Sequence, residues 1–375
     1  MKIANGRVFV DGALRANTDI TIRNGAICAI GEYLPAEETY DATGLMILPG
    51  FIDTHIHGFA GRDTMDGADA VRHMARELIK HGTTSFVATT MTASPEDTHY
   101  AIVGIANAMH APADGAVVLG CHMEGPFFCK KRKGAQPAQH LLDPSVDDFE
   151  TMAGVFGQCV RRLALAPELP GANELIGELV GRGIQVSCGH TDASYEQVMS
   201  AVSAGASSVT HIYNAMTPLG HRDPGAVGAA LDSRQLYAEF IADLVHLHPA
   251  ALRIMYQAKG PELCVAITDS MMAGGMPDGE YSLGGQKVMV SGGAARLADG
   301  TLAGSVLTLR QSLKNMVTKV GVPLDSAIPM YTSTPARMIG EARRGELARG
   351  YEADIIALDS DFELRAAWVG GRRLV

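Results

Sequence analysis

Leu48-Pro49-Gly50-Phe51-Ile52-Asp53-Thr54-His55-Ile56-His57-Gly58 is the segment around which the rest of this chain is expected to be organised. The apolar residues from Met46 to Ile52 predict a buried strand, and this strand leads directly into His55 and His57. Residues two apart in an extended strand point to the same face. Both imidazoles are therefore expected to project into one space, where they would serve as two metal ligands.

Short apolar runs alternate with helix-length segments after this stretch, which is the pattern of parallel βα units. The spacers 70–80 and 195–204 carry apolar residues at helical spacing. The eight candidate strands are 47–53, 85–89, 117–123, 163–166, 184–187, 208–211, 237–241 and 264–268. Eight such strands close a barrel. We therefore predict an α/β fold with a (β/α)8 TIM-type barrel over residues 47–345.

The two ends of the chain have a different texture. Residues 1–46 and 346–375 alternate apolar and polar positions, and Asn5-Gly6, Asp11-Gly12 and Asn24-Gly25 are dipeptides typical of hairpin turns. The two ends are expected to pair into one small β-sandwich domain. The glycine-rich segment 278–304 predicts a hairpin inserted after the eighth strand, and the sequence does not place it against the barrel.

Composition excludes several classes of partner. The chain has 375 residues, 47% of them hydrophobic, so it can bury a large core, and its net charge of -10 argues against nucleic acid or an anionic membrane as a partner. Its six cysteines show no CxxC spacing, which favours reduced thiols in a cytosolic protein. Neither a signal-peptide pattern nor an apolar run of about 20 residues is present, so a cytoplasmic location is expected.

Six polar side chains lie at the ends of five of the apolar runs: His55, His57, Glu124, His190, His211 and Asp269. The carboxyl ends of barrel strands converge on one face, so these residues are expected to meet. A single histidine at a strand end is more often structural, but six polar residues in one register favour a metal site. The nitrogen and oxygen donors, without sulfur, suit catalytic zinc, iron, manganese or cobalt.

A bound divalent cation lowers the pKa of water from 15.7 to about 7, and a neighbouring carboxylate can accept the proton and return it to a leaving nitrogen. Asp269, in Ile-Thr-Asp-Ser-Met, is the candidate for that carboxylate. A plain metal ligand and a helix N-cap are the alternative interpretations of this residue.

Several motifs resemble those of the amidohydrolase superfamily and, within it, the family of N-acetylglucosamine-6-phosphate deacetylases. The superfamily motifs are Pro49 to His57 and Ala353-Asp354. The more specific motifs are His122 to Phe127, Gly189 to Thr191, His211 to Met216, Arg222 to Gly225 and Leu302 to Ser305. Together they extend over nearly the whole chain.

The resemblance implies that Glu124, His190 and His211 bind a metal, that His55 and His57 add a second ion bridged by Glu124, and that Asp269 is catalytic. It implies a phosphorylated amino-sugar substrate, which loses acetate, and a homodimer in which one subunit can lend a phosphate ligand to the other. The implied substrate contacts are Ala135, Gln136, Asn214, Ala215, Arg222, Asp243, His246, Leu302, Ala303 and Gly304.

One segment departs from the family pattern. Lys133-Gly134-Ala135-Gln136 carries glutamine where many members have a histidine that contacts the acetyl carbonyl, and His140 is a less favoured substitute. We hypothesise that a second metal polarises the carbonyl and lessens the need for an imidazole. The basic run Lys130 to Lys133 is interpreted as a solvated loop.

Three alternatives remain at this stage. The substrate can be N-acetylgalactosamine 6-phosphate or another N-acyl compound. The chain can also be a non-enzymatic barrel scaffold, or a protein that stores or senses metal.

Overall fold

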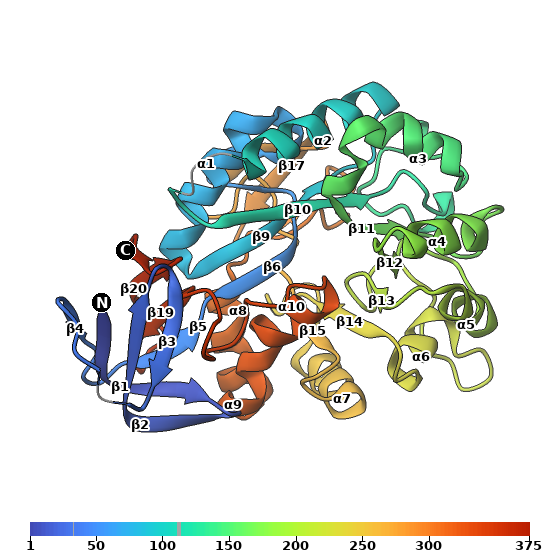
Figure 1. Cartoon of the computed structure of the whole chain (residues 1–375). Helices are drawn as coiled ribbons and strands as arrows, with labels where there is room; N and C mark the ends of the chain where they lie inside the picture. Colours follow the sequence, from blue (N-terminus) through green and yellow to red (C-terminus); the bar gives the residue numbers. More distant parts are fainter. Residues whose placement is uncertain (33, 111–113) are drawn as a thin grey trace.

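The computed structural model describes residues 1–32, 34–110 and 114–375, and its central feature is a parallel eight-stranded sheet (Figure 1). The strands neighbour one another in chain order, from β6 to β15. A parallel bridge between Ile56 and Ser270 and a 2.9 Å hydrogen bond from Asp269 N to His55 O link the first strand to the segment after the last. The strands are β6 (Phe51–Ile56), β9 (Thr83–Thr90), β10 (Val117–Glu124), β11 (Val160–Leu165), β12 (Gln185–Cys188), β13 (Ser208–Val209), β14 (Tyr237–Phe240) and β15 (Cys264–Ala266). The predicted barrel is thereby confirmed.

Helices surround this barrel on the outside (Figure 1). Their starts follow ordinary capping rules: Ser94 caps α2 with Pro95 at its first position, and Ser194 and Gln197 form a capping box on α5. They are α1 (Ala68–Leu78), α2 (Pro95–Met109), α3 (Val146–Ala153), α4 (Ala172–Gly181), α5 (Tyr195–Ala204), α6 (Gly225–Asp232), α7 (Pro249–Lys259), α8 (Leu309–Asn315), α9 (Leu324–Ala327) and α10 (Ser333–Met338). Among the described residues, no helix combines the length and apolarity needed to cross a membrane.

The predicted first strand, 47–53, is wrong as a single element. It is divided at Gly50 into β5 (Met46–Pro49), which pairs with β1 and β19, and β6, which begins the barrel. Gly50 N bonds to Asp354 O and Phe51 N bonds to Gly82 O, so the chain changes sheets between these two residues. A Cβ on Gly50 would lie 2.0 Å from Thr84 Oγ1. Both β5 and β6 are buried and apolar, so their composition does not indicate that the strand is divided at Gly50.

The two chain ends pair with each other, as expected. Their strands form one sheet in the order β21-β20-β19-β5-β1-β2-β3, with β4 also paired to β1. These strands are β1 (Lys2–Val10), β2 (Ala13–Arg23), β3 (Ala26–Ile30), β4 (Thr39–Asp41), β19 (Ile355–Leu358), β20 (Leu364–Val369) and β21 (Arg372–Arg373).

This terminal sheet is buried on both faces. Ile356 and Leu48 belong to the hydrophobic core of the barrel, whereas Ile355 and Trp368 belong to a second core on the other face. The sheet thus shares a core with the barrel, and a separate sandwich domain is not confirmed.

Two of the three predicted hairpin turns are confirmed. Asp11-Gly12 and Asn24-Gly25 connect β1 to β2 and β2 to β3, with positive φ angles at all four residues. Asn5-Gly6 is instead a bulge within β1, where the pairing register with β2 shifts. The dipeptide supplies a left-handed residue in either setting, so it does not distinguish a turn from a bulge.

The inserted segment 278–304 is a three-stranded antiparallel sheet rather than a hairpin. It consists of β16 (Gly279–Leu283), β17 (Gln286–Ser291) and β18 (Ala294–Arg296). Its Leu283 and Val288 share a hydrophobic cluster with Met91 and Met271, which flank the carboxyl ends of barrel strands. Gln286 Nε2 donates to Ala135 O at 2.5 Å. The insert therefore lies beside the face where the predicted site residues gather.

Candidate active site

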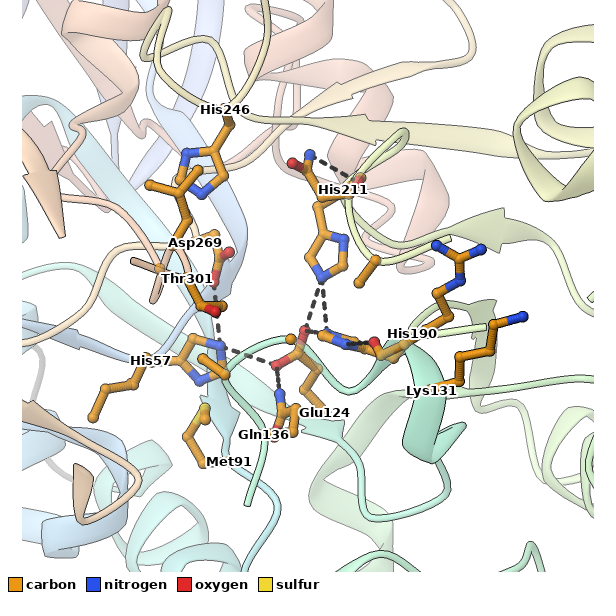
Figure 2. A pocket seen from close by; sticks show the side chains of 18 residues that line it. His57, Met91, Glu124, Lys131, Gln136, His190, His211, His246, Asp269 and Thr301 are labelled. Atoms are coloured by element: carbon orange, nitrogen blue, oxygen red, sulfur yellow. Dashed lines mark hydrogen bonds and ion pairs between the residues drawn. The ribbon is translucent and has the colours of Figure 1, made fainter. Parts of the chain in front are cut away.

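The six polar residues predicted at strand ends converge in the structure. Figure 2 shows five of them: His57, Glu124, His190, His211 and Asp269. His55 lies within β6 and His57 directly follows it, Glu124 ends β10, and the other three follow β12, β13 and β15 by two or three residues. All six are buried. The convergence expected of barrel strand ends is confirmed.

Three of these residues have left-handed backbone conformations. The φ angles are 46° at His190, 31° at His211 and 48° at Asp269. A non-glycine residue in this region costs roughly 1 to 3 kcal/mol and persists only where neighbouring contacts hold it. Asp269 is held by bonds from its N to His55 O and from Ser305 N to its own O. Such strain is typical of functional sites, where it aims a side chain that a regular strand would not.

The side chains form two adjacent ligand groups. One contains His55, His57 and Asp269, and the other contains Glu124, His190 and His211. The Nε2 atoms of His55 and His57 lie 3.3 Å apart, and those of His190 and His211 lie 3.1 Å apart.

Glu124 lies between the two groups. Its Oε2 is 3.2 Å from His57 Nε2, and its Oε1 is 3.3 Å from both His55 Nε2 and His211 Nε2. Ligand atoms about 2.0 to 2.2 Å from one tetrahedral ion are roughly 3.3 to 3.6 Å from each other. The donor set and its spacing therefore fit one or two divalent ions, with Glu124 available to both.

The electrostatics of the site also favour a cation. Burial alone lowers the pKa of His57, but its contacts with Asp269 and Glu124 outweigh burial and raise that pKa to about 9. Burial raises the pKa of Asp269, yet the neighbouring His55 and His57 bring it below the ordinary value. Asp269 is therefore a carboxylate at neutral pH, which a base must be.

Two ligands are held by the loop that follows β10. His190 Nδ1 lies 3.0 Å from Arg132 O, which fixes the ring and leaves Nε2 facing the other ligands. Gln136 Nε2 donates to Glu124 Oε2 at 2.6 Å, and Gln136 Oε1 accepts from Thr92 N at 3.0 Å. Gln136 thus orients Glu124, and its contact with an acetyl carbonyl stays a prediction.

A cavity of about 360 Å³ opens over the two groups. Seven of the ten predicted substrate contacts line it: Ala135, Gln136, Asn214, Ala215, His246, Leu302 and Gly304. Asp243 lies behind His246, with Oδ2 2.6 Å from its Nδ1, and Ala303 is fully buried between two lining residues.

Arg222 is the exception among the predicted contacts. It is exposed and lines a separate hollow with Asp192 and Leu219, not the cavity over the ligands. Sequence reasoning placed it by motif alone, and the motif does not say which side of its loop faces the site.

Several lining residues were not predicted as contacts, among them Met91, Leu283 and Thr301. Lys131 and Arg132 also line the cavity and pair with Asp192 at 2.6 and 2.9 Å, so the basic run is only partly a solvated loop. Figure 2 shows Lys131 beyond His190, away from His57. Lys131 and Arg132 could have been predicted to line the cavity only from their closeness to Gln136 in the sequence.

Known proteins resemble this chain over nearly its whole length. It is 40% identical to the N-acetylglucosamine-6-phosphate deacetylase of Lysinibacillus sphaericus, over 94% of this chain and 92% of that protein. It is 39% identical to the N-acetylgalactosamine-6-phosphate deacetylase of Escherichia coli O157:H7, over 94% and 93% of the two chains.

A solved structure agrees with these relatives. A mutant N-acetyl-D-glucosamine-6-phosphate deacetylase from Mycobacterium smegmatis, in complex with N-acetyl-D-glucosamine-6-phosphate, superimposes with a TM-score of 0.94 at 33% identity, over 100% of this chain and 99% of that one. Residues 46–374 match the amidohydrolase family. With its two ligand groups at the carboxyl ends of a parallel barrel, the chain belongs to the amidohydrolase family.

Proposed function

We propose that this protein hydrolyses N-acetyl-D-glucosamine 6-phosphate to D-glucosamine 6-phosphate and acetate. The observation that carries the proposal is Asp269, a carboxylate that lines the cavity within 3.5 Å of two histidines of a metal-ligand group. Likeness to the deacetylases of Lysinibacillus sphaericus and Mycobacterium smegmatis supports the choice of substrate.

The ligand groups suit one or two divalent ions, which supply Lewis acidity and bring the pKa of water to about 7. Asp269 accepts a proton from the attacking water as the water oxygen adds to the acetyl carbonyl carbon. Asp269 then delivers that proton to the sugar nitrogen as the C–N bond breaks, which releases acetate and a free amine.

The cavity also contains groups suited to an anionic sugar. His246, backed by the Asp243 carboxylate, lines one side, and Lys131 and Arg132 line another. Asn214 adds an amide at the end of the loop after His211. These donors support recognition of a phosphate and of sugar hydroxyls.

We also propose a homodimer. Arg222 lies outside the cavity of its own chain, and this placement is compatible with a phosphate contact in a partner subunit. The six free cysteines support a cytoplasmic location.

A second candidate substrate is N-acetylgalactosamine 6-phosphate, because one relative at 39% identity carries that name. The two sugars differ in one hydroxyl orientation, and the reacting group is the same. Acetate release from both phosphorylated sugars and both free sugars distinguishes them, with metal content measured on the same sample. Tight metal binding without any acetate release would instead support a storage or sensing protein.

A further inference from the structure

His55 differs from the other histidines of the site in what lies behind its ring. Its Nδ1 is 3.4 Å from Glu239 Oε2, whereas His190 Nδ1 faces a backbone carbonyl. In the described part of the chain, His57 Nδ1 and His211 Nδ1 have no hydrogen-bond partner. Among the four rings, His55 is therefore the one backed by a carboxylate.

Glu239 lies on β14 and is completely buried inside the barrel. Its Oε1 accepts a hydrogen bond from the guanidinium of Arg162, which extends from β11 and is also completely buried. Arg162 donates further to Thr54 O at 3.2 Å, next to His55 in the chain. Thr54 Oγ1 lies 3.5 Å from the same Glu239 oxygen. The Arg162–Glu239 ion pair thus lies in the layer of side chains directly behind the site.

This arrangement has a chemical consequence for His55. A carboxylate paired with arginine is only an acceptor, so the His55 nitrogen that faces it must carry the proton. The other nitrogen, Nε2, then presents its lone pair toward Glu124 and Asp269 at 3.3 and 3.5 Å. Carboxylates behind metal-bound histidines fix the tautomer in this way.

Stability alone gives little reason for such a pair. Burying two charges is expensive, and apolar residues of the same volume often stabilise a core equally well or better. The Arg162–Glu239 pair contacts only His55 among the site histidines, whereas Glu124 and His190 of the other group are held by the loop after β10.

We propose that Glu239, fixed by Arg162, is a positioning residue that holds His55 in its ligand tautomer and so controls occupancy of the His55–His57–Asp269 group. The Glu124–His190–His211 group retains its ion without it. The inference rests on the proposed metal-dependent function, which it deepens by assigning the two ions to separate supports.

The test measures metal binding rather than activity. Metal-free protein is titrated with Zn²⁺ or Co²⁺, and bound metal per subunit is determined by elemental analysis. The natural protein should bind two ions. Glu239→Gln should lose roughly 10- to 100-fold in affinity for one ion and keep the other. Two ions bound with unchanged affinities, or one ion in the natural protein at saturation, would overturn the proposal.

A double variant guards against misfolding. Glu239→Gln leaves the Arg162 charge buried without its partner, so Glu239→Gln with Arg162→Gln removes both charges and should lose the same ion. Gln185→Met is the matched control, because Gln185 accepts from Arg162 Nε at 3.1 Å and, among the described hydrogen bonds, touches neither Glu239 nor His55. An equal loss of affinity in Gln185→Met would mean that any loosening of the barrel interior suffices, and the proposal would fail.

The natural protein offers an independent measurement. In zinc-loaded, ¹⁵N-histidine-labelled protein, the His55 ring should be protonated at Nδ1, with His55→Asn used to assign its signal. Protonation at Nε2 would refute the proposal whatever the variants do. Acetate release by the natural protein is measured in parallel, so failure of the proposed reaction is seen separately from failure of this inference.

Discussion

Replacing Asp269 by asparagine tests the proposed reaction most directly. The substitution keeps the shape of the side chain and removes its charge and its ability to hold a proton. The left-handed φ of 48° at this position is tolerated by asparagine, so the backbone between β15 and the cavity is expected to stay in place.

The expected loss can be worked from what Asp269 touches. General acid–base catalysis contributes roughly 10²- to 10⁴-fold, and Asp269 is proposed to serve both proton transfers. Its Oδ1 also lies 3.3 Å from His57 Nε2, so it belongs to one ligand group. We therefore expect kcat to fall by about 10³-fold or more, which corresponds to about 4 kcal/mol of transition-state stabilisation. The Glu124 group does not include Asp269, so at least one ion per subunit should remain.

The assay is acetate release from N-acetylglucosamine 6-phosphate at saturating substrate, with metal content measured on the same sample. Asp11→Asn is the matched control, because Asp11 is an exposed aspartate that also has a left-handed φ, of 50°. This control should retain full activity. A kcat for Asp269→Asn within tenfold of the natural protein would refute the assignment. Loss of all bound metal would show that Asp269 is needed as a ligand rather than as a base.

Three other changes test the remaining parts of the argument. Gln136→Met should weaken metal binding about 10-fold by removing the 2.6 Å bond to Glu124, and an unchanged affinity in a metal titration would contradict this. Arg222→Met should raise KM for the phosphorylated sugar and leave the free sugar nearly unaffected, whereas equal effects on both would exclude a phosphate contact. Burial lowers the pKa of Lys259 from 10.5 to about 8, so the unfolded chain binds a proton that the folded chain has released between these values. Relative to Lys259→Met, the natural protein should therefore gain about 1 to 3 kcal/mol of stability as pH rises through that window. Urea unfolding of both proteins at pH 7.5 and pH 10 measures this gain. The same stability difference between the two proteins at both pH values would contradict it.

Local patterns were sufficient where a single element decides the outcome. The segment 195–204 has apolar residues at helical spacing behind a serine cap, and it is a helix with those bounds. Asp11-Gly12 forms the expected turn because its two left-handed residues match the twist of the flanking strands. Strand bounds were less regular, since the sixth predicted strand, 208–211, is paired only at Ser208 and Val209.

Predictions failed where the outcome depends on a partner far away in the chain. The break at Gly50 follows from Asp354 and Gly82 taking hydrogen bonds on either side of it. The bonds of Gln136 to Thr92 and Glu124 were likewise not predicted, while its contact with an acetyl carbonyl stays a prediction. None of these hydrogen-bond partners can be identified from the residues adjacent to Gly50 or Gln136 in the sequence.

The barrel class and the polar residues that meet at its carboxyl face could be predicted from the sequence, because strand period and strand-end position are local properties. They bring His55, Glu124, His190, His211 and Asp269 to one face. Which side chains lie behind these residues, and which predicted contacts face the cavity, depends on packing between strands that are far apart in the chain. Glu239 and Arg162 lie within ordinary-looking strands, and nothing in their neighbours marks them as supports for His55. Their role exists only because β6, β11 and β14 point these side chains into one buried interior, where a charge must find a partner.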